Sequence, residues 1–300
     1  MKRFVPLFLL LLFGVGPGCG PTYPKNELAP SLAHLCKEEY GIDVSVQIVG
    51  KTIGVQVPLE KLFDSTLKLS PEVGDKLDGV ILATSRVVLS TTDPPDFYVV
   101  VARDKRIPGV ELKLTRYVQD IRRLNYGDLS RNEYTKRMLF EFGLGLGIFE
   151  KDDHFHLDEV TLEKFLAEQT AQRIRSHLDD EKELKKELEV KSVQGTYLSR
   201  RFVFNLDVQK KGIGLWGSLG SEEEKKTLEA ALSVIMEVLR GYHFEAFESV
   251  EIRTPFLTHA VVLEKNVLEL YRRKKINLSE LLLPNDFNLS AHDVELFLKK

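Results

Sequence analysis

The sequence is poor in the residues and patterns that most often reveal chemistry. It has two cysteines and a single tryptophan in 300 residues. It contains no P-loop, no Cys-x-x-Cys pair and no His-Glu-x-x-His motif, which removes the strongest sequence evidence for nucleotide hydrolysis, thiol redox chemistry and zinc proteolysis. A formal net charge of -3 argues against a nucleic-acid partner, because such proteins present a basic field to phosphates. We therefore expect no cofactor and favour a non-catalytic protein, with an enzyme as the alternative.

Long apolar runs are also scarce, and the longest lies at residues 4–13, directly after Lys2 and Arg3. This run is shorter than the roughly 20 apolar residues that a membrane-spanning helix needs, and it has the length of the apolar region of a signal peptide. Small residues and Cys19 follow it. We expect residues 1–18 to be a signal peptide and the protein to be exported.

The charged start, the leucine-rich run and Gly18 before Cys19 resemble the signal of a bacterial lipoprotein, although Gly16 and Pro17 depart from that pattern. The resemblance covers only the N-terminal segment that ends near Cys19. It implies that Cys19 carries diacylglycerol and an amide-linked acyl chain, and that the protein is anchored in the bacterial cell envelope, facing the periplasm.

Two alternatives to the lipid anchor remain open. The protein could be a plain secreted one, or Cys19 could form a disulfide with Cys36. The second alternative conflicts with the position of Cys36, which follows Leu32 on one apolar helical face, where a buried thiol is expected.

The remainder of the chain runs through one order of elements twice. In each half a helix is followed by two alternating strands, a helix, two more strands and a short basic helix. Ser70 with Pro71, and Ser221 with Glu224, are typical of helix starts. We therefore expect an α+β protein of two similar αββαββα lobes from an internal duplication, each an antiparallel sheet with helices on one face.

The residues of the two halves suggest a register as well as an order. Placing Phe97 on Phe247 also places Arg103 on Arg253. A shift of one residue aligns the apolar faces of the paired helices equally well, so the sequence leaves the register open.

Composition and turn signals predict the boundaries of the parts. We expect one continuous charged helix over residues 158–188, with Asp158 as its N-cap. The predicted parts are a signal peptide (1–18), a tether (19–26), a first unit (27–137), a glycine-rich and acidic connector (138–160), a second unit (161–283) and a helical tail (284–300).

Aromatic residues beside glycine-rich segments are the candidate partner contacts. Trp216 lies in such a segment of the second half, and the equivalent segment of the first half holds Phe63. Phe142 and Phe149 flank the glycines of residues 143–147. Aromatic side chains presented in this way often anchor a partner, and the alternative is a loop packed on its own core.

A metal site is not expected. His154 and His156 lie among acidic residues and are weak candidate ligands. Two histidines two positions apart, without distant partners, are more typical of a solvated linker.

These features together favour a lipid-anchored envelope protein that acts as a non-catalytic binding or assembly module. Its membrane contact would run through the lipid on Cys19, and an envelope protein is the candidate partner. The alternative is a periplasmic enzyme or small-ligand binder with a cleft between the lobes, since pockets favour domain interfaces. The sequence leaves self-association open.

Overall fold

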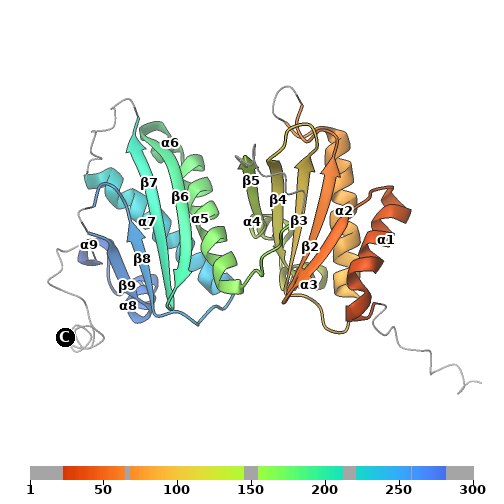
Figure 1. Ribbon diagram of the computed structural model, residues 1–300. Coiled ribbons are helices and arrows are strands. Elements are labelled where there is room, and N and C mark those ends of the chain that lie inside the picture. The colour runs from red at the N-terminus through yellow and green to blue at the C-terminus, as the bar shows by residue number, and fades with distance from the viewer. Residues whose placement is uncertain (1–22, 65–67, 145–154, 212–220, 258, 282–300) are drawn as a thin grey trace, which may run out of the picture. The chain divides into compact units, whose positions relative to one another are not determined.

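The computed structural model describes residues 23–64, 68–144, 155–211, 221–257 and 259–281, shown in colour in Figure 1. The chain divides into two compact units, residues 1–159 and 160–300. The expected signal peptide, Cys19 and the tail at residues 284–300 lie outside the described residues. Within those residues, no helix combines the length and the apolar character that crossing a membrane requires.

The N-terminal unit is a five-stranded sheet with helices on one face. Its strand order is β1-β2-β3-β4-β5, in which β2 and β3 run parallel and the other neighbours antiparallel. The elements are a 3-10 turn Lys25–Glu27, α1 Leu28–Tyr40, β1 Ser45–Val49, β2 Thr52–Leu59, α2 Pro71–Leu89, β3 Phe97–Asp104, β4 Val110–Tyr117, α3 Val118–Tyr126, α4 Arg131–Lys136 and β5 Leu139–Leu144.

The C-terminal unit repeats the plan with four strands in the order β6-β7-β8-β9. The central pair, β7 and β8, is again parallel and the outer pairs are antiparallel. The elements are α5 Leu162–Asp180, α6 Lys182–Glu187, β6 Leu188–Leu198, β7 Arg201–Lys210, α7 Ser221–Gly241, β8 Ser249–Arg253, β9 Val261–Glu264, α8 Lys265–Arg272 and α9 Leu278–Leu281.

The α+β class and the repeated αββαββα order are confirmed. The expectation of antiparallel sheets is correct for all the neighbouring pairs of these two sheets except one in each. It is wrong for β2 with β3 and for β7 with β8, which are parallel. The reason is the helix between the two hairpins. A strand that returns through a helical crossover lies parallel to its neighbour, whereas a tight turn can only join antiparallel strands.

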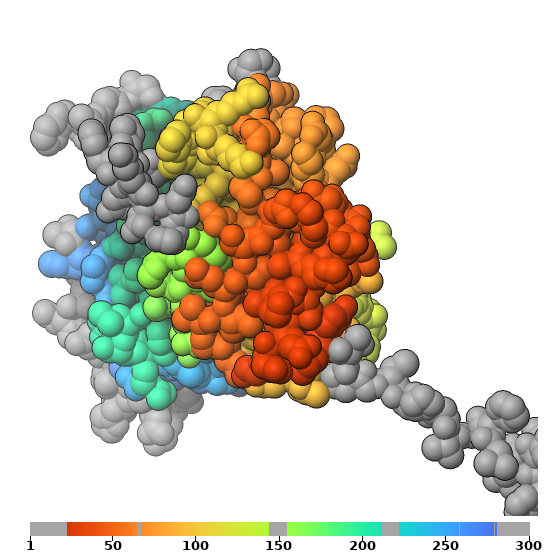
Figure 2. All heavy atoms as spheres, turned by 45° about the vertical axis from the view of Figure 1, so that its right-hand side comes forward, coloured from red at the N-terminus to blue at the C-terminus, as the bar shows by residue number. Residues whose placement is uncertain are grey.

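The core of the N-terminal unit lies between α1, α2 and α3 and one face of the sheet. Ile53, Val55 and Val57 of β2 alternate into this core, and α1 contributes Cys36, which is fully buried as expected. Figure 2 shows α1 (red) beside the β1–β2 hairpin (orange).

The opposite face of β2 is covered by residues 155–157, within the segment that the sequence had indicated as a connector. A Cβ atom on Gly54 would lie 2.7 Å from the ring of Phe155 and 2.8 Å from Leu157. The Gln47 amide donates a hydrogen bond of 2.6 Å to the carbonyl of Phe155. Glycine at position 54 therefore allows this segment to lie directly on the sheet.

In the C-terminal unit α5 and α7 pack on one face of the sheet. Phe202, Phe204 and Leu206 of β7 point into this core. Gly195 lets α5 approach β6, because a Cβ atom there would lie 2.1 Å from the carbonyl oxygen of Ala167. The close approach of a helix to the backbone of β6 depends on this glycine.

The helix start predicted at Ser70 is confirmed, and two glycines end a helix or turn the chain. Ser70 caps α2 by accepting a hydrogen bond from the backbone N–H of Val73, and Gly41 ends α1 in the left-handed conformation. Gly50 occupies the tight turn between β1 and β2 with φ of 56°. The side chain of Ser221 lies outside the described part, so its expected capping box is not tested.

Two expected boundaries are wrong. Residues 139–144, predicted as the start of a connector, form β5, because their alternating apolar residues pair with β4. The helix expected over 158–188 begins at Leu162, where Thr161 accepts a hydrogen bond from the N–H of Lys164. It breaks at Glu181, whose backbone is extended, so α5 and α6 are separate.

The units share a backbone arrangement that fixes their register. The N–H of Asp96, directly before β3, donates to the carbonyl of Lys51 in the β1–β2 turn at 2.8 Å. The N–H of Glu248, directly before β8, donates to the carbonyl of Arg200 in the β6–β7 turn at 2.7 Å. These bonds place Asp96 and Glu248 in equivalent positions.

The carbonyls of the same two residues accept equivalent bonds. Val118 N–H donates to Asp96, and Lys265 N–H donates to Glu248, each at 2.9 Å. Phe97 therefore corresponds to Ser249, and the alignment of Phe97 with Phe247 is wrong by two positions. A shift of two residues preserves which face each side chain occupies, so the apolar pattern could not reveal the error.

Candidate partner-binding site

The structure brings together two of the aromatic residues that the sequence indicated as partner contacts. The rings of Phe63 and Phe142 meet edge-to-face, with centroids 5.1 Å apart and an interplanar angle of 86°. Trp216 and Phe149, the other two, lie outside the described residues.

Phe142 is positioned by β5, the last strand of its sheet. It lies opposite Leu112 of β4, and Phe140 lies opposite Leu114 on the same face of the strand. Phe142 is 55% exposed and Phe140 is 47% exposed. Strand alternation therefore presents two aromatic rings side by side at the sheet edge.

Phe63 is positioned by the segment that follows β2. It forms an isolated bridge with Leu69, which is 41% exposed. The preceding residue, Leu62, is fully buried, and its N–H donates to the carboxylate of Asp104 at 2.8 Å. This anchoring fixes the backbone next to the Phe63 ring.

Asp104 also organises the turn between β3 and β4, where it accepts hydrogen bonds from the N–H groups of Arg106 and Ile107 at 2.8 and 3.0 Å. Burial acts to raise the pKa of Asp104. The backbone hydrogen bonds, including that from Leu62, outweigh the burial and leave the pKa below its ordinary value. An ionised carboxylate thus ties this turn to the segment that carries Phe63.

We call Phe63, Leu69, Phe140 and Phe142 the aromatic patch. Exposed single apolar residues are common, but several in contact are typical of interaction surfaces. The patch lies beside an edge strand, and edge strands offer backbone groups to which an extended partner segment can add. The sequence did not indicate Leu69 or Phe140, although the alternation of residues 139–144 could have identified Phe140.

A polar network supports β4 beside the patch. The Arg116 guanidinium donates hydrogen bonds to the hydroxyls of Tyr98 and Tyr134 at 3.0 and 2.9 Å, and its carbon lies 5.3 Å from the centre of the Tyr134 ring. Burial raises the pKa of both tyrosines. The phenols therefore stay protonated at neutral pH, and this network is suited to support rather than proton abstraction.

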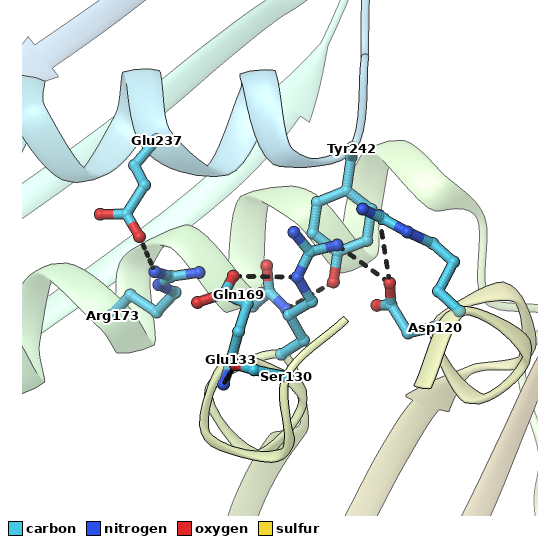
Figure 3. Close-up of polar contacts among 9 residues, drawn as sticks. Asp120, Ser130, Glu133, Gln169, Arg173, Glu237 and Tyr242 are labelled. Carbon is cyan, nitrogen blue, oxygen red and sulfur yellow. Dashed lines mark hydrogen bonds and ion pairs between the residues drawn. The ribbon is translucent and has the colours of Figure 1, made fainter. Parts of the chain in front are cut away.

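A buried ion pair positions the start of β5. Arg137, directly after α4, is 5% exposed, and its guanidinium lies 2.9 Å from the carboxylate of Asp120 in α3. Figure 3 shows the contacts of the Asp120 carboxylate. It also shows Glu133 of α4 and Ser130, the residue directly before α4. Glu133 holds the same arginine at 2.9 Å, and Ser130 caps α4. The strand that carries Phe142 thus begins at a fixed point.

The remaining contacts in Figure 3 belong to the C-terminal unit and tie its two long helices together. Gln169 of α5 donates to the hydroxyl of Tyr242 at 2.8 Å, and Arg173 pairs with Glu237 of α7 at 2.6 Å. These are packing contacts between helices.

The weak metal candidates are not brought into a cluster by the described residues. His156 is 88% exposed and lies 3.7 Å from Asp158, and His154 lies outside the described part. Across the described ranges, no group of three or more His, Cys, Asp or Glu residues could hold a metal ion.

Comparisons with known proteins identify no family. No family model and no curated protein match the chain. One solved structure is similar, the crystal structure of sex pheromone staph-cAM373 precursor, with 10% identity over 75% of this chain and 71% of that chain. The TM-score is 0.20, and a likeness this low carries no argument.

Proposed function

We propose that this protein is a lipid-anchored protein of the bacterial cell envelope that acts as a non-catalytic binding or assembly module. Cys19 is the anchor and the periplasm the compartment. The partner is an envelope protein that covers the aromatic patch with an apolar segment. The observation that carries the proposal is the contact between Phe63 and the exposed ring of Phe142 at the edge of the sheet.

The anchor follows from the N-terminal sequence. Two or more acyl chains on one N-terminal cysteine hold a protein firmly on a bilayer, whereas a single chain binds only marginally. The patch gives the anchored protein a surface with which to bind, because aromatic rings supply much contact area at low entropic cost.

The anchor is tested by fractionating cells that express the native chain or Cys19→Ser, with mass spectrometry of the N-terminal peptide. We expect the native chain in the membrane fraction with an acylated Cys19, and the variant soluble or unprocessed. Equal solubility of both chains, with cleavage at another site, refutes the anchor.

The patch is tested by the size of the native complex in membranes, measured for the full chain on native gels. Phe142→Ser should release the chain from its complex. Tyr126→Ser is the matched control, because Tyr126 is an aromatic residue with 80% exposure at the end of α3. An unchanged complex in the Phe142 variant refutes a role of the patch.

A further inference from the structure

The C-terminal unit carries a charged cluster on the sheet face opposite its core. Glu251 of β8 is 5% exposed, and its two carboxylate oxygens are held by two arginines. Arg201 of β7 reaches one oxygen through Nη1 at 3.0 Å, and Arg253 reaches the other through Nε at 2.6 Å. The strands that carry these residues are neighbours (Figure 1).

The two arginines remain accessible although the carboxylate between them is buried. The side chain of Arg201 is 49% exposed and that of Arg253 is 56% exposed. On the flanking strands of the same face, Leu198 is 73% exposed and Val262 is 43% exposed. This part of the sheet face is therefore open to solvent.

The hydrogen bonds leave donors unused on both arginines. Arg201 uses Nε for the hydroxyl of Ser249 at 3.1 Å and Nη1 for Glu251. Arg253 uses Nε for Glu251. An arginine has five N–H donors in a planar fork, so each of the two keeps terminal N–H groups for another acceptor.

The N-terminal unit shows that this fold does not need the charges. In the shared register Phe97 corresponds to Ser249, so Val99 takes the place of Glu251 and Val101 that of Arg253. Both valines are buried. The same sheet position is thus apolar in one unit and charged in the other.

Stability gives no reason to retain a buried carboxylate between two arginines. Replacing such a triad by apolar residues of similar volume is often neutral or stabilising, because the ion pairs only partly repay the loss of hydration. Burial acts to raise the pKa of Glu251, and the hydrogen bonds from Arg253 and Arg201 more than offset it, so the pKa is lowered. The carboxylate is ionised at neutral pH and holds both guanidinium groups in place.

We propose that Arg201, Glu251 and Arg253 form a binding site for an oxyanion group, a carboxylate or a phosphate, of a ligand that lies on the open sheet face. Glu251 is the positioning residue, and the free N–H groups of the two arginines contact the ligand. Fixed guanidinium forks match the paired oxygens of carboxylates and phosphates. This proposal is independent of the lipid anchor and of the aromatic patch.

The test is a titration of the full chain with inorganic phosphate or with acetate. The arginine side-chain N–H groups are monitored by NMR during the titration, and chloride keeps the ionic strength constant. We expect saturable shifts of Arg201 and Arg253 with at least one of the two probes. A response to phosphate alone assigns phosphate ligands, and a response to acetate assigns carboxylates. Shifts with neither probe overturn the proposal.

Variants decide whether the cluster is responsible. Arg253→Gln should weaken binding at least about tenfold, the effect of one charge-assisted hydrogen bond. Arg200→Gln is the matched control. Arg200 lies in the β6–β7 turn next to Arg201, its side chain is 60% exposed, and it pairs with Glu248 and not with Glu251. Equal weakening in both variants indicates general charge attraction and overturns the proposal.

A third variant separates binding from folding. The combination Arg201→Gln, Glu251→Val and Arg253→Gln removes every charge of the cluster and gives position 251 the valine of the N-terminal unit. In this variant and in the native chain the probe response is read from the backbone N–H groups of β7 and β8. We expect the variant to fold and its backbone signals to lose the saturable shifts that the native chain shows. A response equal to that of the native chain overturns the proposal.

Discussion

The rings of Phe63 and Phe142 meet edge-to-face, although Phe63 follows β2 and Phe142 lies in β5. The contact joins a loop to the last strand of the sheet. A double-mutant cycle separates the energy of this contact from the energy of burying each ring. It compares Phe63→Leu, Phe142→Leu and the double variant in denaturant unfolding. We expect a coupling free energy of about 0.5–1.5 kcal/mol, the usual value for such pairs. Strict additivity would contradict the contact.

The close approach of α5 to β6 predicts a strong effect of one added methyl group. Gly195→Ala should lower the free energy of unfolding by about 1–3 kcal/mol, because its Cβ would overlap the carbonyl of Ala167. Gly74→Ala in α2 is the control, since its Cβ meets nothing within 4 Å. Alanine there should stabilise the chain by up to about 1 kcal/mol. Equal effects at both positions would contradict the packing of α5.

The ion pair before β5 predicts a large loss of stability when one partner is removed. Asp120→Asn leaves the buried Arg137 guanidinium without its full counter-charge, and we expect a loss of about 3–5 kcal/mol in thermal or denaturant unfolding. Glu72→Gln breaks the exposed pair with Lys76 and should leave stability unchanged. A small effect at Asp120 would show that the pair does not fix β5.

The thiol of Cys36 should be inert in the native protein. Burial raises its pKa to about 11, whereas an unfolded cysteine titrates near about 8.5. In a Cys19→Ser chain, iodoacetamide at pH 8 should modify Cys36 only after unfolding, as measured by mass spectrometry. Rapid modification of the folded chain would contradict the burial of α1 against the sheet.

The same shift has a consequence for stability. Between about pH 8.5 and 11 the unfolded thiol loses its proton while the folded one keeps it, so stability falls as pH rises through the unfolded value. Cys36→Ala should remove this part of the alkaline loss. Identical unfolding curves against pH for both chains would contradict the raised pKa.

Local features could be predicted from the sequence because their causes are local. The cap at Ser70, the end of α1 at Gly41 and the burial of Cys36 depend on neighbours within one or two helical turns. The strand order could not be predicted so directly. An alternating strand has the same pattern whether its neighbour runs parallel or antiparallel, and the central pair depends on how α2 and α7 cross the sheet.

The candidate site was predicted only in part for a similar reason. Phe142 was selected for the glycines that follow it and Phe63 for its place in the repeat. Their contact depends on pairing between β4 and β5, which no local pattern specifies. The cluster around Glu251 depends on the pairing of β7 with β8, which no local pattern specifies. Its apolar counterpart in the N-terminal unit was hidden because the alignment of the two halves was wrong by two positions.

The central claim is that the protein binds a partner through the aromatic patch, and site-specific photo-crosslinking in intact cells tests it most directly. A photoreactive residue replaces Phe142 in the full chain or, as control, Tyr126, and adducts are identified by mass spectrometry. We predict one discrete adduct with an envelope protein from position 142 and none from position 126. The same adducts from both positions, or none from position 142, would contradict the claim.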